Sequence, residues 1–302
     1  MEHNLTKAYL ALAVVCVVWG TTYFALRIGV ETFPPMLFSS IRQLTAGLAI
    51  FGILRLARKQ ASLPGKQALE QMFAGFLMLS LGNGVIGWSE RYIPSGLAAL
   101  ITSIMPVYIV AINYVSGADR RPPNRFVLTG LFLGCVGIAL MFRDNIMDIA
   151  RPDYLAGVIV AFLAALSWAG GSVYIKQRAS TAPAMTNAAY QLTGGGIGLV
   201  AMSLIFDNYG ELKAVSAESI YALLYLTIFG SLLSYSCFLY ALEKLPVGLA
   251  SIYAYINPFI ALLLGFFLLN EKLTWVTGFA LGAALTGVYF VNRGYRTTKQ
   301  TA

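Results

Sequence analysis

The chain reads IPSGLAALITSIMP from Ile93 to Pro106 and LPVGLASIYAYINP from Leu245 to Pro258. The two stretches share six identities in fourteen positions, and their prolines stay in register. A segment that recurs in this way marks a duplicated structural unit. Two copies of a helical unit that face each other across a bilayer form a pocket at their interface, so the repeat predicts a duplicated membrane bundle.

The composition places this bundle in lipid. Of the 302 residues, 58% are hydrophobic and 11% are charged, which leaves too few charges to cover a soluble globule. The apolar stretches are about 18 to 25 residues long, the length that a helix needs to cross roughly 30 Å of hydrocarbon. Nothing alternates with period two, which argues against a β-barrel. We predict an all-α integral membrane protein with ten transmembrane helices: Ala8–Val30, Met36–Leu56, Met72–Arg91, Ser95–Ser116, Arg125–Phe142, Tyr154–Lys176, Met185–Phe206, Glu218–Leu242, Val247–Leu269 and Leu273–Arg293.

The net charge of +8 does not by itself indicate an acidic partner. The distribution of the positive charges along the chain reports how the protein is oriented in the membrane. With the N-terminus in the cytoplasm, fourteen of the 21 Lys and Arg residues fall on the cytoplasmic side, six fall outside and Arg42 lies in a span. This excess predicts that both termini are cytoplasmic. We expect a multi-pass protein of the cell inner (plasma) membrane, a monomer or weak dimer, with the lipid bilayer and a small-molecule substrate as partners and no nucleic acid.

The two halves, residues 1–150 and 151–302, each contain five predicted spans. An odd number of spans forces the second copy into the opposite orientation, so the repeats are expected to be inverted and to form one transport domain together. Inverted repeats of this kind recur in secondary transporters. The halves align Trp19 with Trp168, Pro34 with Pro183, QLTAG (Gln43–Gly47) with QLTGG (Gln191–Gly195), and TGLFLG (Thr129–Gly134) with TGFALG (Thr277–Gly282).

Several motifs are shared with a known family. They are VWGTTY at Val18–Tyr23, Arg42, the two P-x-G-L-A segments, and NEKLT at Asn270–Thr274 followed by Gly278, Gly282 and Gly287. On these residues, over nearly its whole length, the chain resembles the ten-span EamA-type permeases of the drug/metabolite transporter superfamily. One departure is the turn at Gly117–Arg120, where the family usually has a Gly-Glu-Arg-like sequence. The role of that acid is left open in this half.

The resemblance implies a secondary transporter that works by alternating access. Midplane aromatic residues and few ionised groups favour a neutral or zwitterionic solute with an apolar part, so export of small amphipathic metabolites such as amino acids is expected. A nucleotide-sugar or other metabolite carrier of the same superfamily is the alternative, although it should place several Lys or Arg residues at depth. From other classes, a membrane-embedded lipid-modifying enzyme or a non-transporting scaffold stays open.

Aromatic residues are the first candidates for a binding wall. Trp19 and Trp168 lie near the centres of their spans, whereas lipid-facing tryptophans prefer the interface. They line a cavity, or they are packed in the core with their indole N–H groups satisfied. Tyr23 follows Trp19 by four residues and shares its helix face. Trp88 lies near the outer end of its span, where the interface belt and the cavity rim are equally consistent with it.

Phenol and amide groups at depth supply the polar candidates. Tyr190, Tyr235 and Tyr253 each need a partner or water. Tyr253 lies four residues before Asn257, on the same side of the helix, and is favoured over Tyr255, which cannot share that face. Substrate binding is therefore predicted for Tyr190, Tyr235, Tyr253 and Asn257.

Arg42 is the one strong charge at depth. Its position costs at least ~2.5–3.5 kcal/mol on insertion scales, so something should compensate it. It holds a substrate carboxylate, or it is paired structurally with helix-end carbonyls or reaches the outer face. Its counterpart in the second half is Gln191 or the residue beside it, and Gln191 is predicted to supply a further polar contact.

Two prolines interrupt helix hydrogen bonding at depth. Pro106 and Pro258 each remove a donor and free a carbonyl near the middle of a span. They act as gating hinges, or they only set the geometry of the bundle.

Other chemistry is not indicated. GNGVIG at Gly82–Gly87 matches the dinucleotide fingerprint in letters, but it lies inside a predicted span with no strand before it. There is no Walker motif, no metal-ligand spacing and no catalytic set, and the only histidine is His3. We predict no cofactor, no metal and no enzymatic activity.

Overall fold

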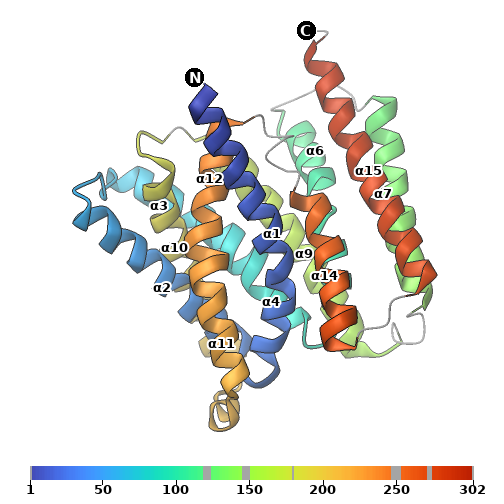
Figure 1. The fold of residues 1–302 in the computed structure, drawn as a ribbon, viewed down its shortest axis with the longest axis horizontal. Coiled ribbons are helices and arrows are strands. Elements are labelled where there is room, and N and C mark those ends of the chain that lie inside the picture. Colours follow the sequence, from blue (N-terminus) through green and yellow to red (C-terminus); the bar gives the residue numbers. More distant parts are fainter. Residues whose placement is uncertain are drawn as a thin grey trace.

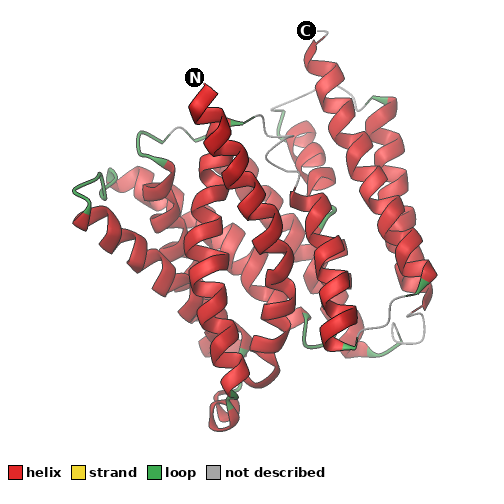
Figure 2. Ribbon diagram, in the orientation of Figure 1, coloured by secondary structure: helices red, strands yellow, loops and turns green. Residues whose placement is uncertain are grey.

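A computed structural model of the chain describes residues 2–117, 124–144, 150–178, 180–245, 253–270 and 274–300. Within these ranges the secondary structure is helical and contains no strand (Figure 2). The expected all-α fold class is thereby confirmed.

The described residues of the first half form five helical segments. They are α1 (Glu2–Thr32); α2 (Pro35–Leu56); a third segment made of α3 (Gly65–Gly75), the π-helix η1 (Phe76–Gly84) and α4 (Val85–Ser89); a fourth made of α5 (Ser95–Thr102) and α6 (Met105–Val115); and α7 (Arg125–Asp144).

The described second half has a similar series. It consists of α9 (Pro152–Lys176); α10 (Ala184–Phe206); the short 3-10 helix η2 (Tyr209–Ala214); a segment made of α11 (Ala217–Tyr225), the π-helix η3 (Leu226–Leu233) and α12 (Ser234–Lys244); α14 (Tyr253–Leu269); and α15 (Trp275–Gln300). Helix α1 begins and α15 ends at the same side of the bundle, the top in Figure 1. Prolines in the first turn of α2 and α9 suit helix starts, because the missing N–H has no partner there.

Seven of these segments are long and apolar enough to cross a membrane. They are Leu5–Thr32, Pro35–Leu56, Gly65–Ser89, Ser95–Val115, Pro152–Lys176, Ala184–Phe206 and Ala217–Lys244. Shorter apolar helices occupy Arg125–Gly137, Ile256–Leu269 and Trp275–Gly287, where the fifth, ninth and tenth spans were expected. The count of ten stays a prediction, because these three apolar stretches are shorter than the other seven. The starts of the ninth span at Val247 and of the tenth at Leu273 also lie outside the described residues.

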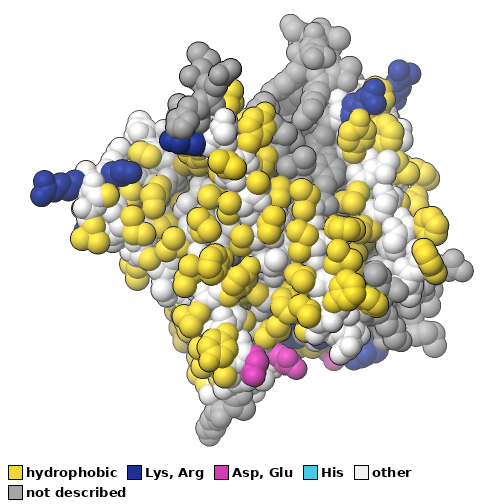
Figure 3. Space-filling view, in the orientation of Figure 1, with side chains coloured by type: hydrophobic (Ala, Val, Ile, Leu, Met, Phe, Trp, Pro, Cys, Tyr) yellow, Lys and Arg dark blue, Asp and Glu magenta, His cyan; other side chains and the backbone are white. Residues whose placement is uncertain are grey.

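The surface has the polarity of a membrane protein. Figure 3 shows hydrophobic side chains across the middle of the visible face, with the described charged side chains toward its two ends. Large hydrophobic residues such as Leu204, Phe267 and Phe279 are well exposed. In water such a surface would drive association, whereas lipid tails accept it.

Helix contacts follow a paired pattern. Helix α7 packs against α15, which Figure 1 shows side by side, and α2 packs against α10. Helix α1 packs against α14 and α12, while α9 packs against α5 and η1. In the same way α10 contacts η1, and α2 contacts η3. Each of these contacts between the halves thus has a counterpart in which their roles are exchanged.

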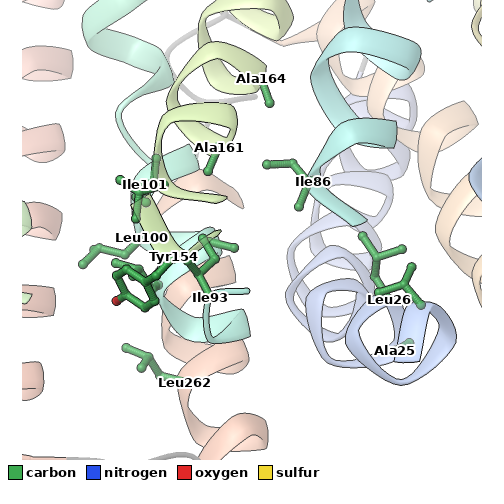
Figure 4. Close-up of a cluster of buried hydrophobic side chains, with 14 of the residues drawn as sticks. Ala25, Leu26, Ile86, Ile93, Leu100, Ile101, Tyr154, Ala161, Ala164 and Leu262 are labelled. Carbon is green, nitrogen blue, oxygen red and sulfur yellow. The ribbon is translucent and has the colours of Figure 1, made fainter. Parts of the chain in front are cut away.

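Two buried hydrophobic clusters fill the bundle. The first includes Leu26 of α1, Ile86 of α4 and Ala161 of α9, with side chains from α5 and α14 (Figure 4). The second lies nearer the start of α1 and includes Trp19 and residues of α2, α9, α10, α12 and α14. The layer between the clusters contains the cavity described below.

Helices α3 and α10 approach so closely that their backbones touch. A Cβ placed on Gly75 would overlap the backbone carbonyl of Gln191, and one placed on Gly194 would overlap the backbone of Met72. Small residues permit this approach in lipid, where no solvent-driven force brings helices together.

We expect the substitution Gly75→Ala to lower stability by about 1–3 kcal/mol, because the methyl group has to displace backbone of the neighbouring helix. Gly170→Ala is the matched control, since a Cβ at Gly170 meets nothing within 4 Å. That control should be neutral or slightly stabilising, as alanine is the better helix former. Thermal unfolding in detergent measures both, and equal midpoints would contradict the close packing.

Candidate functional site

A cavity of about 60 Å³ lies in the interior between the two hydrophobic clusters. Its lining comes from both halves of the chain, including α1, α2, η1 and α5 from the first and α9, η3, α12 and α14 from the second. The volume is well below the roughly 300–1,000 Å³ of pockets that enclose small ligands. The cavity therefore has to widen before it can hold a metabolite.

Most of the residues expected to bind substrate line this cavity. The structure brings together Trp19, Tyr23, Arg42, Trp168, Tyr235, Tyr253 and Asn257 around it. Three others from the same prediction, Trp88, Tyr190 and Gln191, are not part of its lining.

Trp19 is the centre of the aromatic wall. Its ring meets Trp168 edge-on at a centroid distance of 5.8 Å and Tyr253 at 4.9 Å, and it packs against Phe238 at 5.0 Å. The indole Nε1–H donates to the carbonyl of Gly230 over 3.1 Å. Trp19 therefore lines the cavity, and its indole N–H also donates to a backbone carbonyl of η3. The sequence left open whether Trp19 lines a cavity or is packed with its N–H paired, and both descriptions apply.

Arg42 joins the two π-helices across the cavity. Its guanidinium Nε donates to Ser231 Oγ of η3 over 2.8 Å, and one terminal nitrogen donates to Asn83 Oδ1 of η1 over 3.4 Å. Ser231 Oγ donates in turn to Gln43 Oε1 over 3.0 Å. The Arg42 side chain is only 4% exposed, so it stays at depth rather than reaching either surface. π-Helical turns often accompany functional sites.

The three residues that do not line the cavity have other neighbours. Trp88 packs against Tyr92 with ring centroids 4.8 Å apart. Tyr190 packs edge-on against Phe51 at 5.0 Å, and its hydroxyl accepts a hydrogen bond from the Leu63 amide over 3.3 Å.

Gln191, the next residue along from Tyr190, is buried and lines a second, wider cavity. This vestibule has a volume of about 1130 Å³. Ala11, Gln60, Lys176 and Lys244 in its lining lie near the start of α1 or the ends of α2, α9 and α12. The vestibule therefore belongs to the side of the bundle where α1 begins.

A short chain of neutral hydrogen bonds runs from the vestibule lining to the cavity lining, beside the second hydrophobic cluster. Gln191 Nε2 donates to Gln71 Oε1 over 2.6 Å, and the Tyr235 hydroxyl donates to Gln191 Oε1. Gln71 and Gln191 line the vestibule, whereas Tyr235 lines the cavity. We call these three residues the Gln–Tyr bridge.

The opposite side of the bundle is tied by charged groups. The Arg91 guanidinium donates to the Val30 and Phe33 carbonyls, over 2.9 Å in each case, at the end of α1. The Asp207 carboxylate accepts from the Met36 and Leu37 amides at the start of α2, over 3.2 and 2.7 Å. Hydrogen bonds to charged groups are the stronger kind.

The two prolines occupy different settings. Pro106 lies in the first turn of α6, directly after the break that separates α5 from α6. Pro258 lies inside the continuous helix α14. The duplicated stretch is therefore interrupted in its first copy, while residues 246–252 of the second copy lie outside the described ranges.

The polar residues of the site that sequence reasoning missed include Gln43, Gln71, Asn83 and Ser231. Two signals were available: Gln43 aligns with Gln191 in the repeat, and Asn83 interrupts an apolar span between two glycines. Gln71 and Ser231 carry no comparable mark.

The lining can bind a solute without covalent chemistry. Among the described lining residues, Arg42 is the one formally charged side chain. The described ranges hold no group of His, Cys, Asp and Glu that could ligate a metal. The fold and the cavity thus define a polytopic helical membrane protein with a polar, aromatic-walled interior.

Comparison with known proteins identifies the family. The EamA-like transporter family matches residues 6–143 and again residues 155–293, so the chain belongs to it and is a membrane transporter. The chain is 30% identical over 292 residues to the "Uncharacterized inner membrane transporter YedA" of Escherichia coli (strain K12), covering 96% of this chain and 92% of that protein. These relationships and the apolar helices place it in the inner membrane as a multi-pass protein.

Further similarities extend over the same length. "Protein PecM" of Dickeya dadantii (strain 3937) is 29% identical over 277 residues, covering 91% of this chain and 86% of that protein. A solved crystal structure matches with a TM-score of 0.65 at 17% identity, covering 94% of this chain and 96% of that one. At this identity the likeness concerns the fold alone.

The substitution Trp19→Phe should lower stability by about 1 kcal/mol or more, because the smaller ring lacks the donor to the buried Gly230 carbonyl and leaves part of the space of the indole unfilled. Trp275→Phe is the control, since Trp275 is 89% exposed. Unfolding midpoints of the two variants test this, and a midpoint for Trp19→Phe that equals the control would rule out a stabilising indole hydrogen bond.

Proposed function

We propose that this transporter is a secondary carrier that moves small amphipathic metabolites, such as amino acids, out of the cell by alternating access. The observation that carries the proposal is a central cavity whose wall is aromatic and whose described lining has Arg42 as its one charged side chain. Aromatic rings suit the apolar part of a solute, and the guanidinium and amide groups suit its polar part. The substrate role of the lining residues belongs to this proposal.

In the proposal, residues 1–150 and 151–302 are inverted five-helix repeats. The exchanged contacts support this arrangement, because α1 on α14 corresponds to α9 on α5, and α2 on η3 corresponds to α10 on η1. Two repeats related in this way have nearly equivalent gates that open to opposite sides. Both termini are then cytoplasmic, and the vestibule opens to the cytoplasm.

The Gln–Tyr bridge acts as the cytoplasmic gate. Neutral hydrogen bonds contribute about 0.5–1.5 kcal/mol each, less than the roughly 1.5–3 kcal/mol of those to charged groups on the other side. The cytoplasmic side should therefore open first. Opening the bridge would join the cavity of about 60 Å³ to the vestibule of about 1130 Å³, which gives the solute both a path and room.

A phosphate-ester or nucleotide-sugar carrier is a weaker fit. A dianionic group calls for several convergent cations, and the described lining has only Arg42.

Flux in proteoliposomes tests the proposal. We expect radiolabelled amino acid uptake that unlabelled competitors block, and loss of that uptake in Trp19→Ala and in Trp168→Ala with folded protein still in the membrane. Trp275→Ala serves as the exposed control. Normal flux in both cavity variants would refute a role of the aromatic wall in substrate binding. Absence of flux for every amino acid would mean that the substrate is another kind of metabolite.

Thiol labelling tests the gate. Cys16 is buried one turn from Trp19 toward the vestibule, and Cys135 and Cys237 can be replaced by alanine to leave it as the single thiol. The substitution Tyr235→Phe removes the donor to Gln191, so we expect several-fold faster modification of Cys16 by a membrane-impermeant methanethiosulfonate in inside-out vesicles. Tyr240→Phe, in the vestibule lining, is the control. Equal rates in the two variants would mean that the bridge does not close the cavity.

A further inference from the structure

We propose that Arg42 and Gln43 form a subsite for a carboxylate group of the transported solute. This inference rests on the proposed function and names the chemical group that the cavity recognises.

The guanidinium has donors to spare on the cavity side. Arginine offers five N–H bonds, and Arg42 uses one on Ser231 and one on Asn83. Neither its other terminal nitrogen nor any further N–H donates to an acceptor in the described ranges. No Asp or Glu carboxylate of those ranges lies within ion-pair distance of it.

Gln43 gives a second, independent observation. Its side chain is completely buried and lines the cavity, and its Oε1 accepts from Ser231. The Nε2 amide group finds no hydrogen-bond acceptor, which is costly for a buried donor. Arg42 and Gln43 both bind Ser231 Oγ, so their unused donors are close together.

Two adjacent donors, one of them cationic, match the two oxygens of a carboxylate. The planar guanidinium suits this group in shape as well as in charge, since it presents parallel N–H bonds. A single positive charge is neutralised by a monoanion, whereas a phosphate dianion would leave excess negative charge at depth. The subsite therefore selects a monocarboxylate, zwitterions included.

The donors are held in place before the solute arrives. Ser231 fixes both Arg42 Nε and Gln43 Oε1, and Asn83 holds the guanidinium from η1. A donor pair that is already oriented loses little entropy on binding.

Acid and amide forms of the same solute test the inference. The purified protein is titrated calorimetrically with L-phenylalanine and L-phenylalaninamide, with L-leucine and L-leucinamide, with 3-phenylpropionate and 3-phenylpropionamide, and with inorganic phosphate. We expect each acid that binds to do so at least about tenfold more tightly than its amide, and phosphate not to bind. The substitution Arg42→Gln should reduce the acid-to-amide ratio to about one.

Gln43→Glu separates binding from a merely structural role of Arg42. The new carboxylate can still accept from Ser231 while it occupies the unused donors of Arg42. We expect this variant to lose acid binding without a lower unfolding midpoint. A purely structural arginine predicts unchanged binding, so acid binding that persists in Gln43→Glu or an acid preference that persists in Arg42→Gln would overturn the subsite.

The outcomes also separate this inference from the proposed function. Amides that bind as tightly as their acids, or flux of solutes without a carboxylate while the acids are ignored, would overturn the carboxylate subsite and leave the carrier intact. If no solute of the panel binds and none is carried in proteoliposomes, the proposed amino acid carrier fails together with the subsite.

Discussion

The buried guanidinium of Arg42 is the interaction on which the interior of this transporter depends. A charge at this depth costs at least ~2.5–3.5 kcal/mol on insertion scales, and the hydroxyl of Ser231 and the amide of Asn83 compensate it. Both partners lie where a span leaves α-helical geometry, one in η1 and one in η3. Arg42 thus connects the two π-helices. Trp19 also binds η3, because its indole N–H donates to the Gly230 carbonyl.

The polar contacts differ between the two sides of the bundle. At one side Asp207 caps α2 and Arg91 caps the end of α1, so charged groups meet helix-end amides and carbonyls. At the other side Gln71, Gln191 and Tyr235 are neutral. The glycines that let α3 and α10 touch are next to this neutral bridge, which explains how two short amide side chains meet there.

Much of the fold and part of the site could be predicted from the sequence. Trp19 and Trp168 were found because both lie at midspan and correspond in the repeat, and the structure brings their rings together. Tyr190 and Gln191 were predicted together, but consecutive helix residues point in different directions, so Tyr190 packs against Phe51 and Gln191 lines the vestibule. Gln71 and Ser231 look ordinary in sequence, and only their partners across the bundle give them a role.

The sequence by itself determined that this chain lies in a membrane, that it is helical and that its halves are related, because hydrophobic length and repetition are properties of contiguous residues. The tertiary structure decided which polar groups meet. The π-helices shift the faces of their spans, and the crossing of α3 with α10 and of α2 with η3 sets which side chains share a cavity. The contacts at these two crossings join residues more than a hundred positions apart, and no local pattern along the chain encodes them.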